Sequence, residues 1–339
     1  MPDKLIKWSN TLIGLMIFGC VSVLAQEKEV VVPRDTSFTL YGTYVKESKR
    51  RPYIKMVLPD LPQGIAAFEN IEYSRPYVGR SLLLNVYRPD DKRVYPALIL
   101  VHGGGWSSGS LQMEVPMAQV VARKGYVTIP VEYRLSPEAG YPAAVYDLKT
   151  AVRWVKASAE KYGIDTTKIA ISGTSAGGQL AALIGITNGQ SQYECILEYP
   201  QYSSTVQAVI NIDGITDFTD KAALASINEA LAKGKMPAAV KWFGGGYEEK
   251  KKDWIAASSV FHITEHSVPI CFINSSIDRF HDGRDQTIAR LNSNNIYSEV
   301  HTLPDTPHPF WLFEPWFDIT TEYMAAFLDK MFKAVSTLQ

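Results

Sequence analysis

Hydrophobic residues fall into short continuous runs that alternate with longer segments of helical periodicity. Residues 95–101 are apolar throughout, which is typical of a strand buried on both faces of a sheet. Other strands are predicted at 70–73, 82–87, 126–133, 206–213, 268–274, 298–303 and directly before Gly173. Helices are predicted at 111–124, 143–162, 284–292, 320–334 and directly after Ser175. This alternation predicts an α/β fold, with a mostly parallel central sheet and helices on both faces.

The same pattern divides the chain into a lead-in and one domain. Residues 26–69 mix short β-like patches, a basic run and several prolines, and we expect an irregular lead-in there. The regular pattern covers 70–339. Within it, residues 217–266 hold helical pieces and a run of three glycines, which indicates a small helical, lid-like insertion.

Residues 1–25 carry the features of a secretory signal peptide. Two lysines precede an apolar run over 11–24, and Val23-Leu24-Ala25 before Gln26 fits a signal-peptidase site. The run is shorter than the ~20 residues that a membrane-spanning helix needs. We expect cleavage after Ala25 and export, with the periplasm as the destination. Cys20 lies in a faint lipoprotein-like pattern, so a lipid anchor in the outer membrane stays open.

Composition narrows the classes of protein. The chain has 339 residues, 46% of them hydrophobic, and a net charge of −1. This near-neutral balance argues against nucleic acid as a partner. A domain of this size needs no disulfides, so we expect Cys195 and Cys271 to be unpaired thiols. His262 and His266 have i, i+4 spacing without a third ligand nearby; neither a metal nor a cofactor is expected. The oligomeric state is not predicted.

A Gly-x-Ser-x-Gly pattern at 173–177 carries the first candidate chemistry. It joins a short apolar strand to an Ala- and Leu-rich helix, the context in which this motif holds a nucleophilic serine on a tight turn. Small residues are needed on both sides because the strand and the helix nearly touch. The following helix directs its N-terminus at Ser175, where developing negative charge is favoured.

A second glycine-rich motif follows the buried strand at 95–101. His102 is followed there by three glycines and Trp106. Glycines let the backbone approach a ligand and turn N–H groups towards it. Acyl transfer needs such donors for the oxyanion of its tetrahedral intermediate. We expect His102 to orient this loop by hydrogen bonding rather than to act as a base.

Four motifs occur in order: His-Gly-Gly-Gly at 102–105, Glu-Tyr-Arg-Leu-Ser-Pro-Glu at 132–138, Tyr-Pro-Ala-Ala at 141–144 with Asp147, and Gly-x-Ser-x-Gly-Gly at 173–178. With them the chain resembles the α/β-hydrolase superfamily, and within it carboxylesterases of the hormone-sensitive-lipase and carbohydrate-esterase type, over roughly residues 70–335.

The resemblance implies a catalytic triad in the chain order Ser, Asp, His. It also implies that the backbone N–H groups of Gly104, Gly105 and Ala176 form the oxyanion hole. Arg134 and Asp147 are implied to pair beneath the site in a structural role.

The triad acid in this family follows the strand after the lid, so Asp278 is the expected acid. Asp282 and Asp285 are nearby rivals, and Asp213 and Asp217, after the preceding strand, are weaker candidates. The expected base is His308, on a proline-flanked loop after the last strand. His301 falls inside that strand and suits a structural position better. Ser175, His308 and Asp278 would then act together.

Two clusters bear on the substrate. Trp106 and Trp311 are expected to stack on a sugar ring, although most aromatics of 310–317 suit core packing. Arg279, His281 and Arg284 lie near the expected acid and suit a carboxylate-bearing substrate; alternatively, Arg284 pairs with Asp282 or Asp285 at a helix start.

Export and these residues favour a secreted esterase acting on plant cell-wall polysaccharide, with esterified pectin (methyl or acetyl ester) preferred. Feruloyl or acetyl-xylan ester is the alternative. A serine peptidase of this fold is a further alternative, but such enzymes usually carry a large β-propeller, which we do not expect here. A purely binding module would not need all these motifs.

Overall fold

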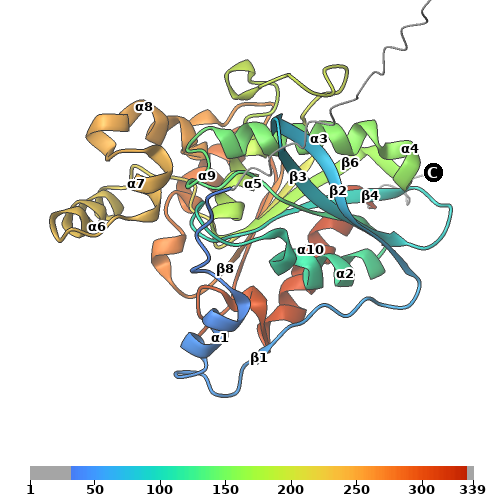
Figure 1. Cartoon of the computed structure of the whole chain (residues 1–339), viewed down its shortest axis with the longest axis horizontal. Coiled ribbons are helices and arrows are strands. Elements are labelled where there is room, and N and C mark those ends of the chain that lie inside the picture. The colour runs from blue at the N-terminus through green and yellow to red at the C-terminus, as the bar shows by residue number, and fades with distance from the viewer. Residues whose placement is uncertain (1–31, 334–339) are drawn as a thin grey trace, which may run out of the picture.

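The computed structural model describes residues 32–333, which fold around an eight-stranded sheet in the order β2-β3-β5-β4-β6-β7-β8-β9 (Figure 1). The strands are β2 (Ile65–Tyr77), β3 (Arg80–Pro89), β4 (Tyr95–Val101), β5 (Val127–Val131), β6 (Ile164–Thr174), β7 (Ala208–Ile212), β8 (Ile270–Asn274) and β9 (Ser298–Thr302). Strand β3 pairs antiparallel with β2 and β5, and the remaining pairs are parallel. The predicted mostly parallel α/β sheet is therefore confirmed.

Helices cover both faces of this sheet (Figure 1). The helices are α1 (Leu40–Glu47), α2 (Val115–Arg123), α3 (Ala143–Ala157), α4 (Ala159–Tyr162), α5 (Ala176–Ile186), α6 (Lys221–Ala232), α7 (Ala238–Phe243), α8 (Tyr247–Ala257), α9 (Arg284–Ser293) and α10 (Trp316–Phe332). The apolar run of β4 explains the two layers, because its side chains alternate between them. Ile99 packs in the core with α3 and α5, whereas Leu98 and Leu100 pack in the core with α2 and α10.

Two helix boundaries differ from the predicted ones. The long helix predicted at 143–162 is interrupted at Ser158, which ends α3 and precedes α4. The last helix begins at Trp316 rather than at residue 320, because Trp316 and Phe317 are buried core residues of its first turn. Most aromatics of this stretch therefore serve packing, as expected.

The insertion predicted at 217–266 consists of α6, α7 and α8 and a short 3-10 turn at Ser259–His262. These helices extend from one end of the molecule, in gold and orange in Figure 1. None of the residues of α6 is buried, whereas Trp242 of α7 and Trp254 of α8 are fully buried. The insertion is thus anchored through α7 and α8 and leaves α6 as its outer part.

The expectation of an irregular lead-in over 26–69 needs correction. This segment contains α1, which Thr39 caps by accepting a hydrogen bond from the N–H of Gly42. It also contains β1 (Lys55–Met56), which pairs with β10 (Phe313–Glu314). The boundary at residue 69 falls inside β2, which begins at Ile65. The sequence signal is weak there because β2 is an edge strand whose first half has no buried residue.

Some expectations concern the ends of the chain. The predicted signal peptide and Cys20 lie outside the described residues. Over residues 32–333, no helix has the length and apolar character needed to cross a membrane. Cys195 and Cys271 are both free thiols, as expected.

Candidate active site

Ser175 lies on the tight turn between β6 and α5. Its backbone has φ +53° and ψ −117°, a conformation that non-glycine residues rarely adopt. The turn is tight because the residues two positions before and after Ser175 are glycines, as the motif predicts. A Cβ on Gly173 would lie 2.1 Å from the carbonyl oxygen of Gly177, and one on Gly177 would lie 2.1 Å from that of Val101. The sequence folds into this strained turn because no larger residue fits at either position.

His308 reaches Ser175 from the loop that follows β9. Its Nε2 lies 2.8 Å from the Ser175 Oγ, so the hydroxyl donates to the imidazole when Nδ1 carries the ring proton. The structure thus brings together two residues that the sequence places 133 positions apart. His301, the rival histidine, lies on β9 and stacks on the ring of Tyr323 instead.

The acid that contacts His308 is Asp213, not the expected Asp278. The Nδ1–H of His308 donates to Asp213 Oδ2 at 2.8 Å, and the Asp213 side chain is completely buried. The side chain of Asp278 is fully exposed. The rivals Asp282 and Asp285 make no hydrogen bond to His308 in the described part of the chain. Asp217 accepts hydrogen bonds from Thr219.

Strand order explains this correction. Strand β7 pairs directly with β6, and its last residue, Ile212, lies opposite Thr174. The next residues, Asp213 and Ser175, therefore leave adjacent strands side by side at the carboxyl edge of the sheet. Asp278 follows β8, one strand further away, and lies four residues beyond its end. Asp213 has φ +52°, in the left-handed region that aspartate tolerates better than most residues.

Several groups hold the Asp213 carboxylate in place. Its Oδ1 accepts hydrogen bonds from the Ser275 N–H at 2.7 Å and from the Asn274 side chain at 3.4 Å. Arg284 donates to Asn274 Oδ1 and to Asp285, and His281 contacts the carbonyl oxygen of Ser275.

His281 and Arg284 therefore support the acid side of the site and do not border the cavity beside Ser175. Their expected role in substrate binding is corrected, and the pairing of Arg284 with Asp285 is the alternative that the structure shows. Trp311 likewise borders another cavity and packs edge-on against the His308 ring.

The electrostatics of the site favour a neutral base. Burial lowers the pKa of His308, although the hydrogen bond and the charge of Asp213 act in the opposite direction. A histidine with a lowered pKa is unprotonated at pH 7 and can accept the Ser175 proton. The buried Asp213 carboxylate then stabilises the imidazolium that forms.

Two of the three expected oxyanion donors, Gly105 and Ala176, border the same cavity as Ser175, and Gly104 directly precedes Gly105 in the glycine loop. Gly104 and Gly105 have φ values of +122° and +59°, which turn their peptide groups in a way that glycine allows. Ala176 is the first residue of α5. Within residues 32–333, no group accepts a hydrogen bond from the backbone N–H of these three residues. They are therefore free to bind a developing negative charge beside Ser175.

Replacing Gly104 with alanine is expected to lower kcat by about 10²–10³-fold with little change in KM. A Cβ at Gly104 would lie 2.1 Å from the carbonyl oxygen of Ser108, so the loop must move and its N–H groups lose their alignment. Steady-state kinetics on an aryl ester would measure the effect. Gly189→Ala is the control, because Gly189 also has a positive φ but an added Cβ meets nothing within 4 Å. A loss confined to KM would contradict the assignment.

The glycine loop rests on buried polar groups. The His102 ring stacks on Tyr133 at 4.5 Å, and its Nδ1 lies 2.8 Å from the carbonyl oxygen of Gly103. Burial lowers the pKa of His102 to about 4, so this ring stays neutral and orients the loop, in line with the sequence-based interpretation. Arg134 and Asp147 form a bidentate ion pair, as the resemblance implied.

Sequence reasoning missed Glu114, a completely buried carboxyl group below the serine turn. It accepts a hydrogen bond from Thr174 Oγ1 at 2.8 Å, and Thr174 directly precedes Ser175. Burial raises the pKa of Glu114 to about 8, so it is mostly protonated at pH 7. No motif marks this residue, because its role depends only on the packing of the chain around it.

A cavity of about 620 Å³ opens beside Ser175 and extends beneath α6. Its walls include Trp106, Ala176 and apolar residues of α6 and α7. Trp106 is mostly buried, donates its indole N–H to Gln179 and stacks on Trp242, so it forms a rigid wall rather than an open stacking face.

Acidic side chains predominate among the charged walls of this cavity. Four carboxylates besides Asp213 border it, those of Asp217, Asp220, Asp278 and Asp282. Arg279 is the only cationic residue among its described walls. Burial, together with Asp220 and Asp217, raises the pKa of Asp282 to about 6. Of the five residues expected to bind substrate, the structure places only Trp106 and Arg279 at this cavity.

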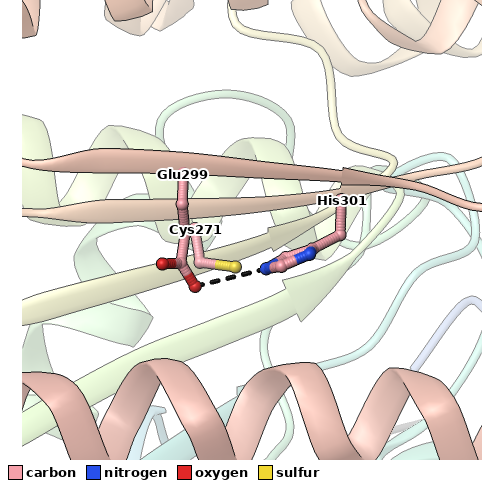
Figure 2. A group of neighbouring side chains, drawn as sticks. All are labelled: Cys271, Glu299 and His301. Carbon is pink, nitrogen blue, oxygen red and sulfur yellow. Dashed lines mark hydrogen bonds and ion pairs between the residues drawn. The ribbon is translucent and has the colours of Figure 1, made fainter.

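One further cluster has metal-binding residue types. Cys271, Glu299 and His301 lie on adjacent strands with their ligand atoms within 4.8 Å of one another (Figure 2). Glu299 already accepts hydrogen bonds from Lys330 and Tyr297 and contacts His301. Burial raises the pKa of Cys271 well above its usual value, so its thiol stays protonated. The carboxylate is therefore engaged, and a metal would have to displace Lys330. His262 contacts Tyr193 instead of pairing with His266.

The fold and this site together define an α/β-hydrolase. The BD-FAE family model matches residues 84–292, more than half of the chain. The chain therefore belongs to the BD-FAE family.

Curated relatives match parts of the chain. Esterase LipC of Mycobacterium tuberculosis is 39% identical over 143 residues, which cover 41% of this chain and 35% of LipC. Ethyl acetate hydrolase of Pseudomonas putida is 26% identical over 239 residues, covering 68% of this chain and 72% of that protein. The first of these matches thus spans about a third of its relative.

Solved structures share the fold. Esterase Est2 of Thermogutta terrifontis with propionate bound has a TM-score of 0.65 at 23% identity, covering 83% of this chain and 98% of that one. A bifunctional GH43-CE protein of Bacteroides eggerthii has a TM-score of 0.65 at 24% identity, covering 78% of this chain and 38% of that one.

Proposed function

We propose that this protein is a serine carboxylic-ester hydrolase. The observation that carries the proposal is the hydrogen-bonded series Ser175, His308 and Asp213, in which both hydrogen bonds are 2.8 Å long. The backbone N–H groups of Gly104, Gly105 and Ala176, which have no acceptor within residues 32–333, support the proposal. The names of the relatives support the proposal, because they include an esterase, a carboxylic ester hydrolase and an ethyl acetate hydrolase.

The geometry suits a two-step acyl transfer. Ser175 Oγ attacks the ester carbonyl carbon while His308 Nε2 takes the hydroxyl proton, and the carbonyl oxygen becomes an oxyanion held by the glycine loop and Ala176. His308 then gives that proton to the leaving alcohol, which departs from the acyl-enzyme. Water attacks the acyl group in the same way, its proton passing through His308 to Ser175, and the acid is released.

Hydrolysis of p-nitrophenyl acetate tests this activity. We expect p-nitrophenol release by the wild type and none above background by Ser175→Ala at equal concentration. A p-nitroanilide of a short peptide serves as the comparison, because a serine peptidase would cleave it. Cleavage of the amide alone would favour a peptidase, and turnover of neither substrate would refute the proposed activity.

For the substrate, we propose an ester of a neutral sugar chain, such as an acetylated or feruloylated xylan. An acidic cavity disfavours a polyanion, whereas carboxylates accept hydrogen bonds from sugar hydroxyls. Structural neighbours described as a carbohydrate esterase and a GH43-CE protein support the carbohydrate class. We also propose export to the periplasm, on the basis of the signal-peptide pattern at 1–25.

Esterified pectin, the substrate preferred from the sequence, remains the second candidate because of Arg279. This exposed arginine borders the cavity, where it can contact a uronate carboxylate. The support is weaker than the sequence suggested, since His281 and Arg284 are engaged elsewhere.

A polysaccharide panel separates these substrates. Acetylated xylan, feruloylated xylan and methyl- or acetyl-esterified pectin are incubated with the wild type and with Ser175→Ala. Released acetate, ferulate and methanol are then measured. We expect at least tenfold faster release from a xylan than from pectin, because the carboxylates of the cavity repel free uronates. Faster release from pectin would reverse this preference.

A further inference from the structure

The proposed base, His308, belongs to a stack of three side chains with Phe280 and Arg279. The Phe280 ring lies parallel to the His308 ring, with centroids 3.4 Å apart and an interplanar angle of 7°. The guanidinium carbon of Arg279 lies over the same phenyl ring, 4.5 Å from its centroid. Because His308 covers one face of Phe280 so closely, Arg279 must cover the opposite face. Arg279 and Phe280 both belong to the short turn Asp278–Phe280 after β8.

We propose that Phe280 and Arg279 are positioning residues for His308: Phe280 fixes the plane of the imidazole, and Arg279 acts on the imidazole through its charge from the other face of the phenyl ring. This proposal rests on the esterase function proposed above. The loop after β8 was expected to supply the catalytic acid. In this proposal it positions the catalytic base instead.

The case for Phe280 is geometric. His308 makes one hydrogen bond through each ring nitrogen, to Asp213 through Nδ1 and to Ser175 through Nε2. Because both bonds require the same ring plane, a tilt of the ring weakens both at once. Phe280 covers one face of the imidazole, and Trp311 packs against it at 89° with centroids 5.2 Å apart. These contacts restrict the ring to the plane in which both hydrogen bonds form.

The case for Arg279 is electrostatic. The charged groups that act on His308 are Asp213 from the end of β7, Glu47 from α1, and Arg279. The two carboxylates raise the pKa of His308, and Arg279 lowers it. His281, the other titratable group on this side, lies 3.8 Å from the Asp213 carboxylate. Burial still lowers the pKa of His308 when Arg279 is removed, but the opposing charge of Arg279 is lost, so His308 would become protonated at a higher pH.

Arg279→Gln removes the charge and tests the electrostatic part. Protonated His308 cannot act as a base, so kcat/KM falls as pH falls through its pKa. We expect this acid limb to move to higher pH by about 0.3–1 unit in Arg279→Gln, the size of a charge effect across one ring at a partly exposed site. Arg279→Lys should restore most of the wild-type limb. High salt should move the wild-type limb towards that of Arg279→Gln.

Arg290→Gln is the matched control. Arg290 also lies over a phenylalanine ring, that of Phe261, at 5.8 Å, but it makes no contact with His308. An acid limb unchanged in Arg279→Gln, or moved equally in Arg290→Gln, would overturn the electrostatic part. An arginine that only contacts a uronate would alter pectin kinetics and leave the limb on a neutral aryl ester in place.

Phe280→Leu tests the positioning part. We expect kcat on the aryl ester to fall about tenfold or more, with KM within about twofold, because orientation contributes to the chemical step. Phe280→Tyr, which keeps the ring face, should restore kcat. Wild-type kcat in Phe280→Leu, a loss confined to KM, or an equal loss in Phe280→Tyr would overturn this part.

An NMR titration of His308 separates this inference from the proposed activity. The imidazole signals are followed against pH in Ser175→Ala, with and without Arg279→Gln, and His308→Gln identifies the resonance. This measurement needs no turnover. A protein without ester hydrolysis would refute the proposed function, whereas an unchanged His308 pKa would refute the role of Arg279.

Discussion

Ser175→Ala and His308→Ala should each lower kcat by ~10⁴-fold or more. The two side chains act as one unit, so removing either abolishes nucleophilic attack and leaves only the residual contribution of the oxyanion donors. The melting temperature should stay close to the wild type in Ser175→Ala, which removes one hydroxyl group beside the cavity. It should fall modestly in His308→Ala, which also removes the ring that packs against Phe280 and Trp311. Initial rates on p-nitrophenyl acetate, with active-site titration of the wild type, would give the ratio.

His301→Ala is the control for the histidine change, because His301 lies on β9 and makes no contact with Ser175. It should keep kcat within about threefold, because the contacts of His301 are with Tyr323 and Glu299 and not with the triad. Retention of a tenth of the activity by Ser175→Ala would contradict the proposed mechanism.

Asp213→Asn should lower kcat by about 10³–10⁴-fold. An amide at this position no longer stabilises the imidazolium, and its NH₂ group favours the wrong tautomer of His308. Asp278→Asn is the isosteric comparison, and its loss should stay within about tenfold, because the Asp278 side chain is fully exposed. The ratio of the two kcat values on the same ester decides between the two carboxylates. A larger loss in Asp278→Asn than in Asp213→Asn would reinstate the acid expected from the sequence.

Much of the fold was predictable because the core strands carry a strong local signal. Strand β4 has the same bounds as its apolar run, and β6 and β7 lie in the predicted places, since strand segments buried on both faces are mostly apolar. The edge strand β2 lacks this signal along its exposed first half. Its position depends on pairing with β3, which is a tertiary contact that no local pattern reveals.

The site was predicted unevenly for a related reason. Ser175 and His308 stand in distinctive local contexts, a glycine-bounded turn and a proline-flanked loop. Asp213 and Asp278 each follow a predicted strand, so local pattern could not separate them. Which of the two carboxylates contacts His308 depends on which strand pairs with β6 and on where the loop after β8 places Asp278. One available signal was that Asp213 follows its strand without any intervening residue.

The residues expected to bind substrate show a different limit. Arg284 and His281 have hydrogen-bond partners within ten residues along the chain. Their polar groups are therefore engaged within the protein and do not need a substrate. Composition alone cannot separate such local pairing from a ligand contact. The acidic cavity, in contrast, draws Asp217 and Asp220 from before α6, and Asp278 and Asp282 from after β8. These segments meet only in the folded chain.

Asp213 directly follows β7, so the catalytic acid and the wall of the cavity come from two different segments. The carboxylate that orients the base directly follows a buried strand. The cavity is bordered from a separate loop, residues 276–283, by Asp278, Arg279, Phe280 and Asp282. A designer could therefore exchange much of that loop for sequences of other lengths while the acid stays in place. Retaining Arg279, Phe280 and His281 would be the main constraint on such grafts, so the rest of the loop offers a place to re-engineer substrate choice without rebuilding the catalytic centre.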